Sequence, residues 1–256
     1  MIEILIVMAF VGSLAAGLWD LRTTEIPDEI PMLMAAVGIF YWYVIAITFG
    51  DFYSLFLSIA FGVGFLVFGW LLYRLGQWGG GDAKLLSAIG FMLPIVAGKI
   101  FMIDFLFNLF IVGLAYMIIY ALALGFLNRG IFSRFAREFL QDKIALTLLI
   151  IVSFFTFFAW IVNLQFYFML IILMLVIFWK YARVIEAHVF KKRIPVNKLR
   201  IGDVLDNSKQ WDGITEEELK RIRKTKRFVV IKEGVRFGMV FSINLIVTLL
   251  FGNLLF

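Results

Sequence analysis

The chain has 256 residues, of which 63% are hydrophobic and 16% charged, and its formal net charge is +6. A soluble domain carries about 45–50% apolar and about 25% charged residues, so this composition excludes an ordinary soluble domain and predicts a polytopic membrane protein. With no cysteine and a single histidine, the chain also lacks disulfides, cysteine nucleophiles and paired-histidine zinc motifs.

Charge-free stretches predict the membrane-spanning helices. A helix needs about 20 residues to cross a hydrocarbon core about 30 Å thick. The stretch 85–98 is shorter than this, and it predicts either a short span or a re-entrant segment. The complete set of charge-free stretches is 4–19, 30–50, 52–73, 85–98, 105–128, 144–179 and 237–256.

The stretch 144–179 is too long for one crossing, because a helix of that length would extend about 54 Å. Its most polar interior point lies at Asn163, Leu164 and Gln165. We therefore expect two helices that fold back there. The predicted fold class is an all-α polytopic membrane protein with six to eight transmembrane helices.

Basic residues are distributed very unevenly between the predicted loops. With the segments 20–29, 74–84, 129–143 and 180–236 on one side of the membrane, that side holds 23 of the 24 Lys and Arg, and only Lys99 lies opposite. The positive-inside rule makes this side cytoplasmic and places the N-terminus outside. The same bias accounts for the net charge, so no nucleic-acid partner is expected.

Residues 183–236 are the one sizeable polar region, with 15 Lys and Arg against 8 Asp and Glu. Thr215 and Glu218 have the spacing of a helix capping box, Asp212-Gly213 is typical of a turn, and 227–232 (RFVVIK) predicts a strand. We expect a small α+β cytoplasmic domain between a membrane domain, 1–182, and a final transmembrane helix, 237–256. Its basic surface favours a contact with anionic lipid head groups; docking of a substrate or a partner is the alternative.

Two aspartates lie at the ends of predicted spans, where ionisable residues often serve a function. Asp20 ends the first span, and Asp82 follows Gly79-Gly80-Gly81 at the start of the fourth. By the charge bias both lie at the cytoplasmic face, so the two carboxylates can meet at one depth. The glycines permit unusual backbone dihedrals or the close approach of another segment.

Two neighbouring carboxylates are suited to peptide hydrolysis. They do not both ionise cheaply at short range, so they share a proton. The ionised group can take a proton from an attacking water, and the protonated group can donate to the carbonyl oxygen and then to the leaving amine. This chemistry requires no metal and no cofactor.

Gly79-Gly80-Gly81-Asp82 matches the Gly-x-Gly-Asp motif of membrane aspartyl proteases. Asp20, followed by Leu21-Arg22 and Ile26-Pro27-Asp28, resembles the first catalytic aspartate of the prepilin peptidase family. The C-terminal patterns 212–218 (DGITEEE) and 232–237 (KEGVRF) resemble the archaeal preflagellin peptidase branch.

This resemblance implies a membrane aspartyl endopeptidase with Asp20 and Asp82 as the catalytic pair. Its substrates would be archaellin (preflagellin) or type IV pilin-like precursors, which lose a short basic leader at the cytoplasmic face. Many bacterial members also carry a cysteine-rich segment and methylate their products. Because this chain has no cysteine, we expect proteolysis without methylation.

Other acidic residues are weaker candidates for the first carboxylate. Asp28 and Glu29 lie between Pro27 and Pro31, where a solvent-exposed turn is expected. Together with Glu25 they are candidates for recognising the Lys or Arg of a substrate leader. Further interpretations assign Asp51 to a loop tip, Asp104 to the outer interface and His188 to the surface.

A different class of protein is a small ion- or proton-coupled transporter, in which membrane carboxylates bind cations or protons. Such a protein should show repeated halves with interrupted helices near the bilayer centre, and no convincing repeat is present. A protease-like scaffold without activity is a further alternative, against which the presence of both aspartates counts.

Overall fold

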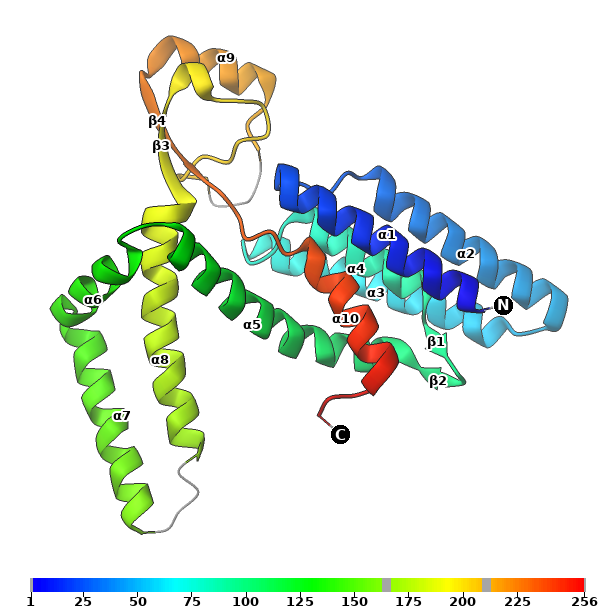
Figure 1. Ribbon diagram of the computed structural model, residues 1–256. Helices are drawn as coiled ribbons and strands as arrows, with labels where there is room; N and C mark the ends of the chain where they lie inside the picture. The colour runs from blue at the N-terminus through cyan, green and yellow to red at the C-terminus, as the bar shows by residue number, and fades with distance from the viewer. Residues whose placement is uncertain (1, 163–166, 209–212, 256) are drawn as a thin grey trace. The chain divides into compact units, whose positions relative to one another are not determined.

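The structure, a computed structural model, describes residues 2–162, 167–208 and 213–255. Its contacts divide the chain into two compact units (Figure 1). The first unit comprises Met1–Tyr116, Arg200–Leu219 and Glu233–Phe256, and the second comprises Met117–Leu199 and Lys220–Lys232. The functional division at residues 182 and 236 stays a prediction, because compactness does not report function.

The first unit is a bundle of apolar helices. Helix α1 packs against α2, α4 and α10, while α4 also packs against α2 and α3. A two-residue antiparallel pair, β1 and β2, separates α4 from α5. The bounds are α1 Ile2–Thr23, α2 Glu29–Phe49, α3 Phe52–Arg74, α4 Gly80–Met92, β1 Ile95–Val96, β2 Lys99–Ile100, α5 Phe101–Leu127 and α10 Gly238–Phe251.

Helix α4 occupies the centre of this unit. Leu85, Leu86, Ile89 and Met92 are almost completely buried, so the helix has no extended lipid-facing side. Its 13 residues rise only about 20 Å, which is too short to cross the membrane. The stretch 85–98 is therefore not a full span. It consists of the end of this helix, strand β1 and the turn that leads to β2.

Close approach of the surrounding helices to α4 depends on small residues. A Cβ atom on Gly38 of α2 would lie 2.8 Å from the backbone nitrogen of Met92. Buried polar groups connect the same helices: the Trp42 indole donates to the Met92 carbonyl at 3.1 Å, and the Ser58 hydroxyl to the Phe91 carbonyl at 2.6 Å. Small residues and interhelical hydrogen bonds are the usual means of helix association in membranes.

We expect Gly38→Ala to lower the stability of the unit by about 1–3 kcal/mol, because the added methyl group meets backbone atoms that cannot rotate away. Gly64→Ala is the matched control, since a Cβ atom there meets nothing within 4 Å. Thermal unfolding in detergent measures both. Equal melting temperatures for the two variants would contradict the proposed importance of this contact.

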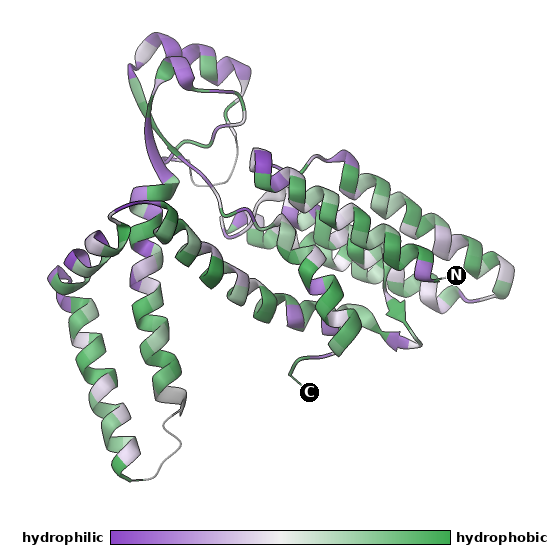
Figure 2. Ribbon diagram, viewed as in Figure 1, coloured by the Kyte–Doolittle hydropathy of each residue, from purple (hydrophilic) through white to green (hydrophobic). Residues whose placement is uncertain are grey.

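The membrane-protein class predicted from the sequence is confirmed. Among the residues that the structure describes, five helices are long and apolar enough to cross a membrane, namely α1, α2, α3, α5 and Lys143–Ile161, and Gly238–Phe251 is a shorter apolar helix. Figure 2 shows the helices mainly in the hydrophobic colour, with hydrophilic residues concentrated around α9 and the β3–β4 pair.

The second unit contains the end of α5 from Met117 onward, helices α6, α7 and α8, most of α9, and a two-stranded sheet. Helix α8 packs against α6 and α7. Strands β3 and β4 are antiparallel, with Lys191 opposite Lys232 and Pro195 opposite Phe228. The bounds are α6 Ile131–Gln141, α7 Lys143–Ile161, α8 Tyr167–Ile185, a π-helical turn Glu186–Phe190, β3 Lys191–Pro195, a 3-10 turn Val196–Lys198, α9 Glu216–Thr225 and β4 Phe228–Lys232.

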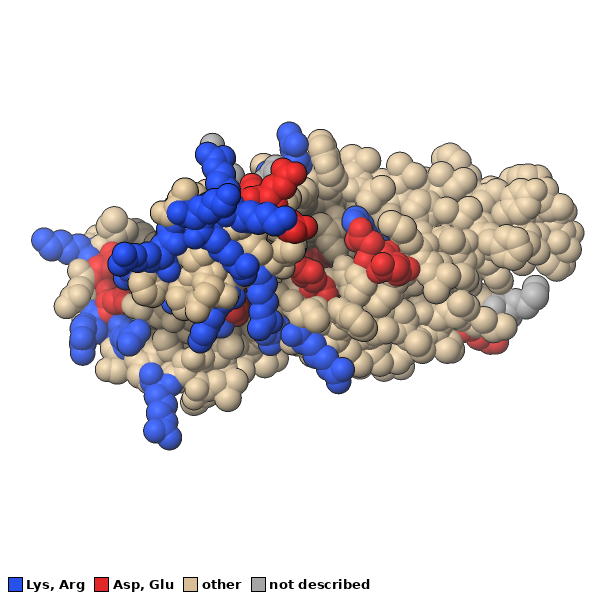
Figure 3. Space-filling model, turned by 90° about the horizontal axis from the view of Figure 1, so that it is seen from above, with Lys and Arg blue, Asp and Glu red and all other residues tan. Residues whose placement is uncertain are grey.

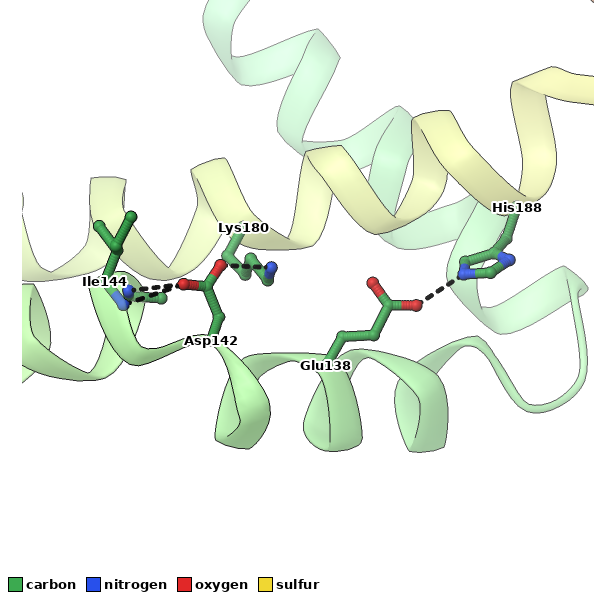
Figure 4. A network of polar contacts seen from close by, with 6 residues as sticks. Glu138, Asp142, Ile144, Lys180 and His188 are labelled. Atoms are coloured by element: carbon green, nitrogen blue, oxygen red, sulfur yellow. Dashed lines mark hydrogen bonds and ion pairs between the residues drawn. The ribbon is translucent and has the colours of Figure 1, made fainter.

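The long apolar stretch 144–179 lies in two helices, α7 and α8, as the length argument predicts. The expected fold-back at Asn163, Leu164 and Gln165 falls outside the described residues. Two polar contacts join the segment 138–142, at the end of α6, to the end of α8 and the π-helical turn that follows it (Figure 4). The Lys180 ammonium lies 2.7 Å from the carboxylate of Asp142, and His188 contacts Glu138 at 2.6 Å.

Asp142 also explains where α7 begins. Its carboxylate accepts hydrogen bonds from the backbone N–H groups of Ile144 and Ala145, at 3.0 and 3.1 Å. The hydrogen bond from Lys180, followed by these backbone bonds, holds the pKa of Asp142 below its usual range. The ionised carboxylate thus caps the helix. Separately, His188 lies on the surface, as predicted.

The local predictions in the polar insert are confirmed where the structure describes them. The Glu218 N–H donates to the Thr215 hydroxyl at 3.3 Å, and the Thr215 N–H donates to the Glu218 carboxylate at 3.0 Å, which completes a capping box before α9. The predicted strand is β4. Its partner β3 was not predicted, and Asp212 lies outside the described residues.

Figure 3 shows Lys and Arg side chains crowded over the part that carries α9, β3 and β4.

Candidate active site

Asp20 lies near the end of α1, and only 6% of its surface is exposed. Its carboxylate accepts a hydrogen bond of 2.8 Å from the backbone N–H of Gly238, the first residue of α10. This contact requires α1 and α10 to lie very close together. Gly17, one turn before Asp20, permits it, because a Cβ atom there would lie 2.8 Å from the Cα of Met239.

Asp82 lies in the first turn of α4. Its carboxylate accepts a hydrogen bond of 3.2 Å from the backbone N–H of Gly79, so the side chain folds back over the start of its own helix. The residue is partly exposed. Water or a substrate group can therefore reach a carboxyl that is largely removed from bulk solvent.

The two carboxylates lie close enough to affect each other. Burial raises the pKa of Asp82, and the negative charge of Asp20 raises it further, while the Gly79 N–H acts in the opposite direction; the result is a pKa of about 7. A carboxyl with this pKa is mostly protonated below neutral pH. The pair thus combines a carboxyl that holds its proton with a second carboxylate beside it.

The glycine run before Asp82 provides space rather than an unusual backbone. None of Gly79, Gly80 and Gly81 has a positive φ angle. A Cβ atom on Gly81 would lie 2.7 Å from the Cβ of Ile26, so the loop after Asp20 crosses directly over the start of α4. Of the two explanations offered by the sequence, close approach of another segment is the one observed.

The three acidic residues considered for leader recognition lie on the surface. Glu25 and Glu29 are exposed, and Asp28 forms an ion pair with Lys84, whose nitrogen lies 2.6 Å from the carboxylate. Both residues are exposed, as predicted, and Asp28 lies in a turn. The expected break at Pro31 is wrong, because Glu29 begins α2 and Pro31 lies in its first turn, where proline is tolerated. Neither residue takes the buried place beside Asp82 that Asp20 occupies.

Glu25 has a further neighbour from the polar insert. A Cβ atom on Gly202 would lie 2.7 Å from a carboxylate oxygen of Glu25, and Gly202 has a φ of +93°. Two backbone hydrogen bonds hold Gly202 there. Its N–H donates to the carbonyl of Ile214, and the N–H of Ile214 donates to the carbonyl of Asp203. A short part of the insert thus lies against the loop that follows Asp20.

Three residues near the aspartates were not singled out from the sequence. Lys84 pairs with Asp28, Gly238 donates to Asp20, and the positive charge of Arg236 acts on Asp20. The pattern KEGVRF at 232–237 was noted, but nothing in it indicates that the next residue contacts the first helix. Among the described residues no group of three His, Asp or Glu is placed to hold a metal ion.

Comparison with known proteins assigns this half of the chain. Residues 6–127 match the profile of the type IV leader peptidase family. This segment is similar to the members of that family. The matched part of the chain contains both Asp20 and Asp82, and it ends with α5. No curated protein and no solved structure matches the chain.

This match supports a protease of the leader-peptidase type. It also agrees with the helical fold, in which the matched segment comprises α1 to α5. The transporter alternative has no comparable support. Helices α6 to α10 lie beyond the matched segment.

Proposed function

We propose that the chain is a membrane aspartyl endopeptidase that removes the short basic leader from archaellin or type IV pilin-like precursors, with Asp20 and Asp82 as its catalytic pair. The observation that carries the proposal is the pair itself. Two carboxyl groups from different helices of a leader-peptidase family segment lie together in the protein interior, where one raises the pKa of the other.

Their surroundings favour different roles. Burial disfavours the ionised form of Asp20, but the Gly238 N–H and the charge of Arg236 act against burial. Asp82 lies beside a negative charge without a comparable positive charge and keeps its proton more readily. Asp20 then takes a proton from water, whose oxygen attacks the scissile carbonyl. Asp82 donates its proton to the carbonyl oxygen.

Breakdown of the tetrahedral intermediate completes the cycle. The proton held by Asp20 passes to the leaving amine as the C–N bond breaks, and the hydroxyl proton of the intermediate returns to Asp82. Both groups are then as they were at the start. Because the carboxyls titrate as a coupled pair, their apparent pKa values belong to the pair.

The charge distribution supports an orientation with the N-terminus outside and the aspartates at the cytoplasmic face. Lys and Arg are concentrated in the segments that flank Asp20 and Asp82 and in 183–236, as the positive-inside rule requires of the cytoplasmic side. A precursor would hold its hydrophobic segment in the bilayer, place its basic leader at this face and be cut between the two. Anionic lipid head groups are the proposed partner of the basic insert.

The decisive experiment mixes the detergent-solubilised protein with an archaellin precursor or a pilin precursor and follows loss of the leader by gel shift and mass spectrometry. We expect cleavage ahead of the hydrophobic segment of at least one precursor. Comparison of the two precursors assigns the substrate. Failure of folded protein to cleave either one would contradict the proposal.

Leader recognition is the finer part of the proposal. Removal of the three charges in Glu25→Gln, Asp28→Asn and Glu29→Gln should raise KM for a basic leader about tenfold, since each exposed ion pair contributes about 0.2–1 kcal/mol. Lys84→Met frees Asp28 from its ion pair and should lower the same KM.

The control for both variants is a precursor with a neutral leader, whose KM should stay constant. If the triple variant cleaves basic and neutral leaders with unchanged KM, these residues do not read the leader. A loss of kcat for both leaders in Lys84→Met would instead assign the ion pair to holding the loop on α4.

A further inference from the structure

The backbone N–H of Gly238 contacts a side chain 218 positions away in the sequence. It donates to the Oδ2 atom of Asp20 at 2.8 Å, in a buried environment. Gly238 is the first residue of α10, so its N–H has no acceptor inside that helix. The donor is therefore fully available to the carboxylate.

Two glycines bring donor and acceptor together. A Cβ atom on Gly238 would lie 3.1 Å from both the Cβ and the Oδ2 of Asp20, and 3.2 Å from the Cα of Gly17. A Cβ atom on Gly17 would meet the backbone of Met239 at 2.8 Å. A Cβ atom on Gly17 forces α10 away from α1 and lengthens the hydrogen bond, whereas one on Gly238 requires its neighbours to move by only a few tenths of an ångström.

Aromatic residues fix the chain as it enters α10. The Tyr116 hydroxyl donates to the Arg236 carbonyl at 2.7 Å. The ring of Phe237 packs against Trp78, which precedes the glycine run, with centroids 5.9 Å apart, and against Phe241 at the same distance. These contacts hold the segment that carries the donor beside Trp78, just before the start of α4.

Helix α10 and the residues just before it lie outside the part of the chain that matches the leader peptidase family. The matched segment, 6–127, provides the two carboxyl groups. Residues 236–238 add the N–H donor and the nearby positive charge. A hydrogen bond to a charged acceptor is stronger than one between neutral groups, and an ionised carboxylate gains most from it.

We propose that Gly238 is a positioning residue of the proposed protease, whose N–H favours the ionised form of the Asp20 carboxylate and orients it toward the attacking water. The assignment rests on the proposed function. It makes the N-terminal turn of α10 a part of the active site, although α10 contributes no catalytic side chain.

Two substitutions of the same residue separate the donor from the space around it. Gly238→Ala adds a Cβ atom and keeps the N–H, whereas Gly238→Pro adds a ring and removes the N–H. Proline is well tolerated at the first position of a helix, although it restricts the residue before it. Relative to Gly238→Ala, we expect Gly238→Pro to lower kcat about 10- to 100-fold and to leave KM within about twofold.

A second variant keeps the test valid if Gly238→Pro does not fold. Gly17→Ala changes no group on α10, but it separates the two helices and should lower kcat with KM unchanged. Gly64→Ala, in open space on α3, is the matched control and should keep wild-type kcat and KM. Thermal unfolding in detergent verifies that each variant is folded.

The outcomes distinguish this inference from the proposed function. If Asp20→Asn and Asp82→Asn abolish cleavage while Gly238→Pro matches Gly238→Ala in kcat, only the role of Gly238 is wrong. If Gly238→Pro is unfolded, wild-type kcat in Gly17→Ala overturns that role. If cleavage survives in both aspartate variants, the proposed function itself falls.

Discussion

Asp20→Asn and Asp82→Asn should each lower the rate of leader cleavage by about 10³-fold or more. Asparagine keeps the size and polarity of the side chain but neither accepts a proton from water nor donates one to the leaving group, and general acid–base catalysis contributes about 10²–10⁴-fold for each group. Asp20→Asn also removes the charge that raises the pKa of Asp82. Single-turnover cleavage of a precursor measures the loss.

Asp51→Asn is the matched control, because it removes one carboxylate from the first unit at a distance from the pair. Asp51 caps α3 through Ser54, and asparagine caps a helix almost as well. This variant should cleave at the wild-type rate. Retention of activity in either Asp20→Asn or Asp82→Asn would exclude that carboxyl from the chemistry.

The second large effect concerns stability: Asp82→Asn should make the protein more resistant to unfolding at pH 8. The pKa of Asp82 is raised from 3.8 to about 7 in the folded protein, so folding disfavours the ionised form. Below pH about 4 the Asp82 carboxyl is protonated in both the folded and the unfolded protein, and it does not reduce stability. The cost grows as pH rises from about 4 to 7 and is constant above that.

The difference between the pKa of Asp82 in the folded and the unfolded protein sets an upper limit of about 4 kcal/mol on this loss of stability. Partial exposure of the side chain makes the actual loss smaller. Thermal unfolding in detergent at pH 4 and pH 8 measures it. The melting temperatures of wild type and Asp82→Asn should agree at pH 4 and differ at pH 8.

Asp51→Asn should behave in the opposite way. Hydrogen bonds from Ser54 hold the pKa of Asp51 below its usual value, so its charge stabilises the fold above that value and the benefit is lost in acid. An equal shift at both pH values in Asp82→Asn would contradict a buried, protonated carboxyl. A variant that is inactive and yet more stable would indicate that Asp82 is retained for its chemistry.

Sequence alone determined the features that depend on nearest neighbours in the chain. The density of apolar residues fixed the membrane class, and the length of 144–179 required two helices. Thr215 and Glu218 formed the capping box that their spacing predicts, because such a box involves one helical turn. The places of Asp20 and Asp82 at the ends of apolar segments were equally visible.

Only the tertiary structure decided which distant groups meet. The donor to Asp20 comes from Gly238, the partner of Asp28 is Lys84, and the short helix α4 is buried rather than exposed to lipid. These contacts follow from helix packing, in which glycines permit approach and charged groups pair across long chain separations. Because packing depends on the whole set of surfaces at once, no local pattern in one chain specifies it.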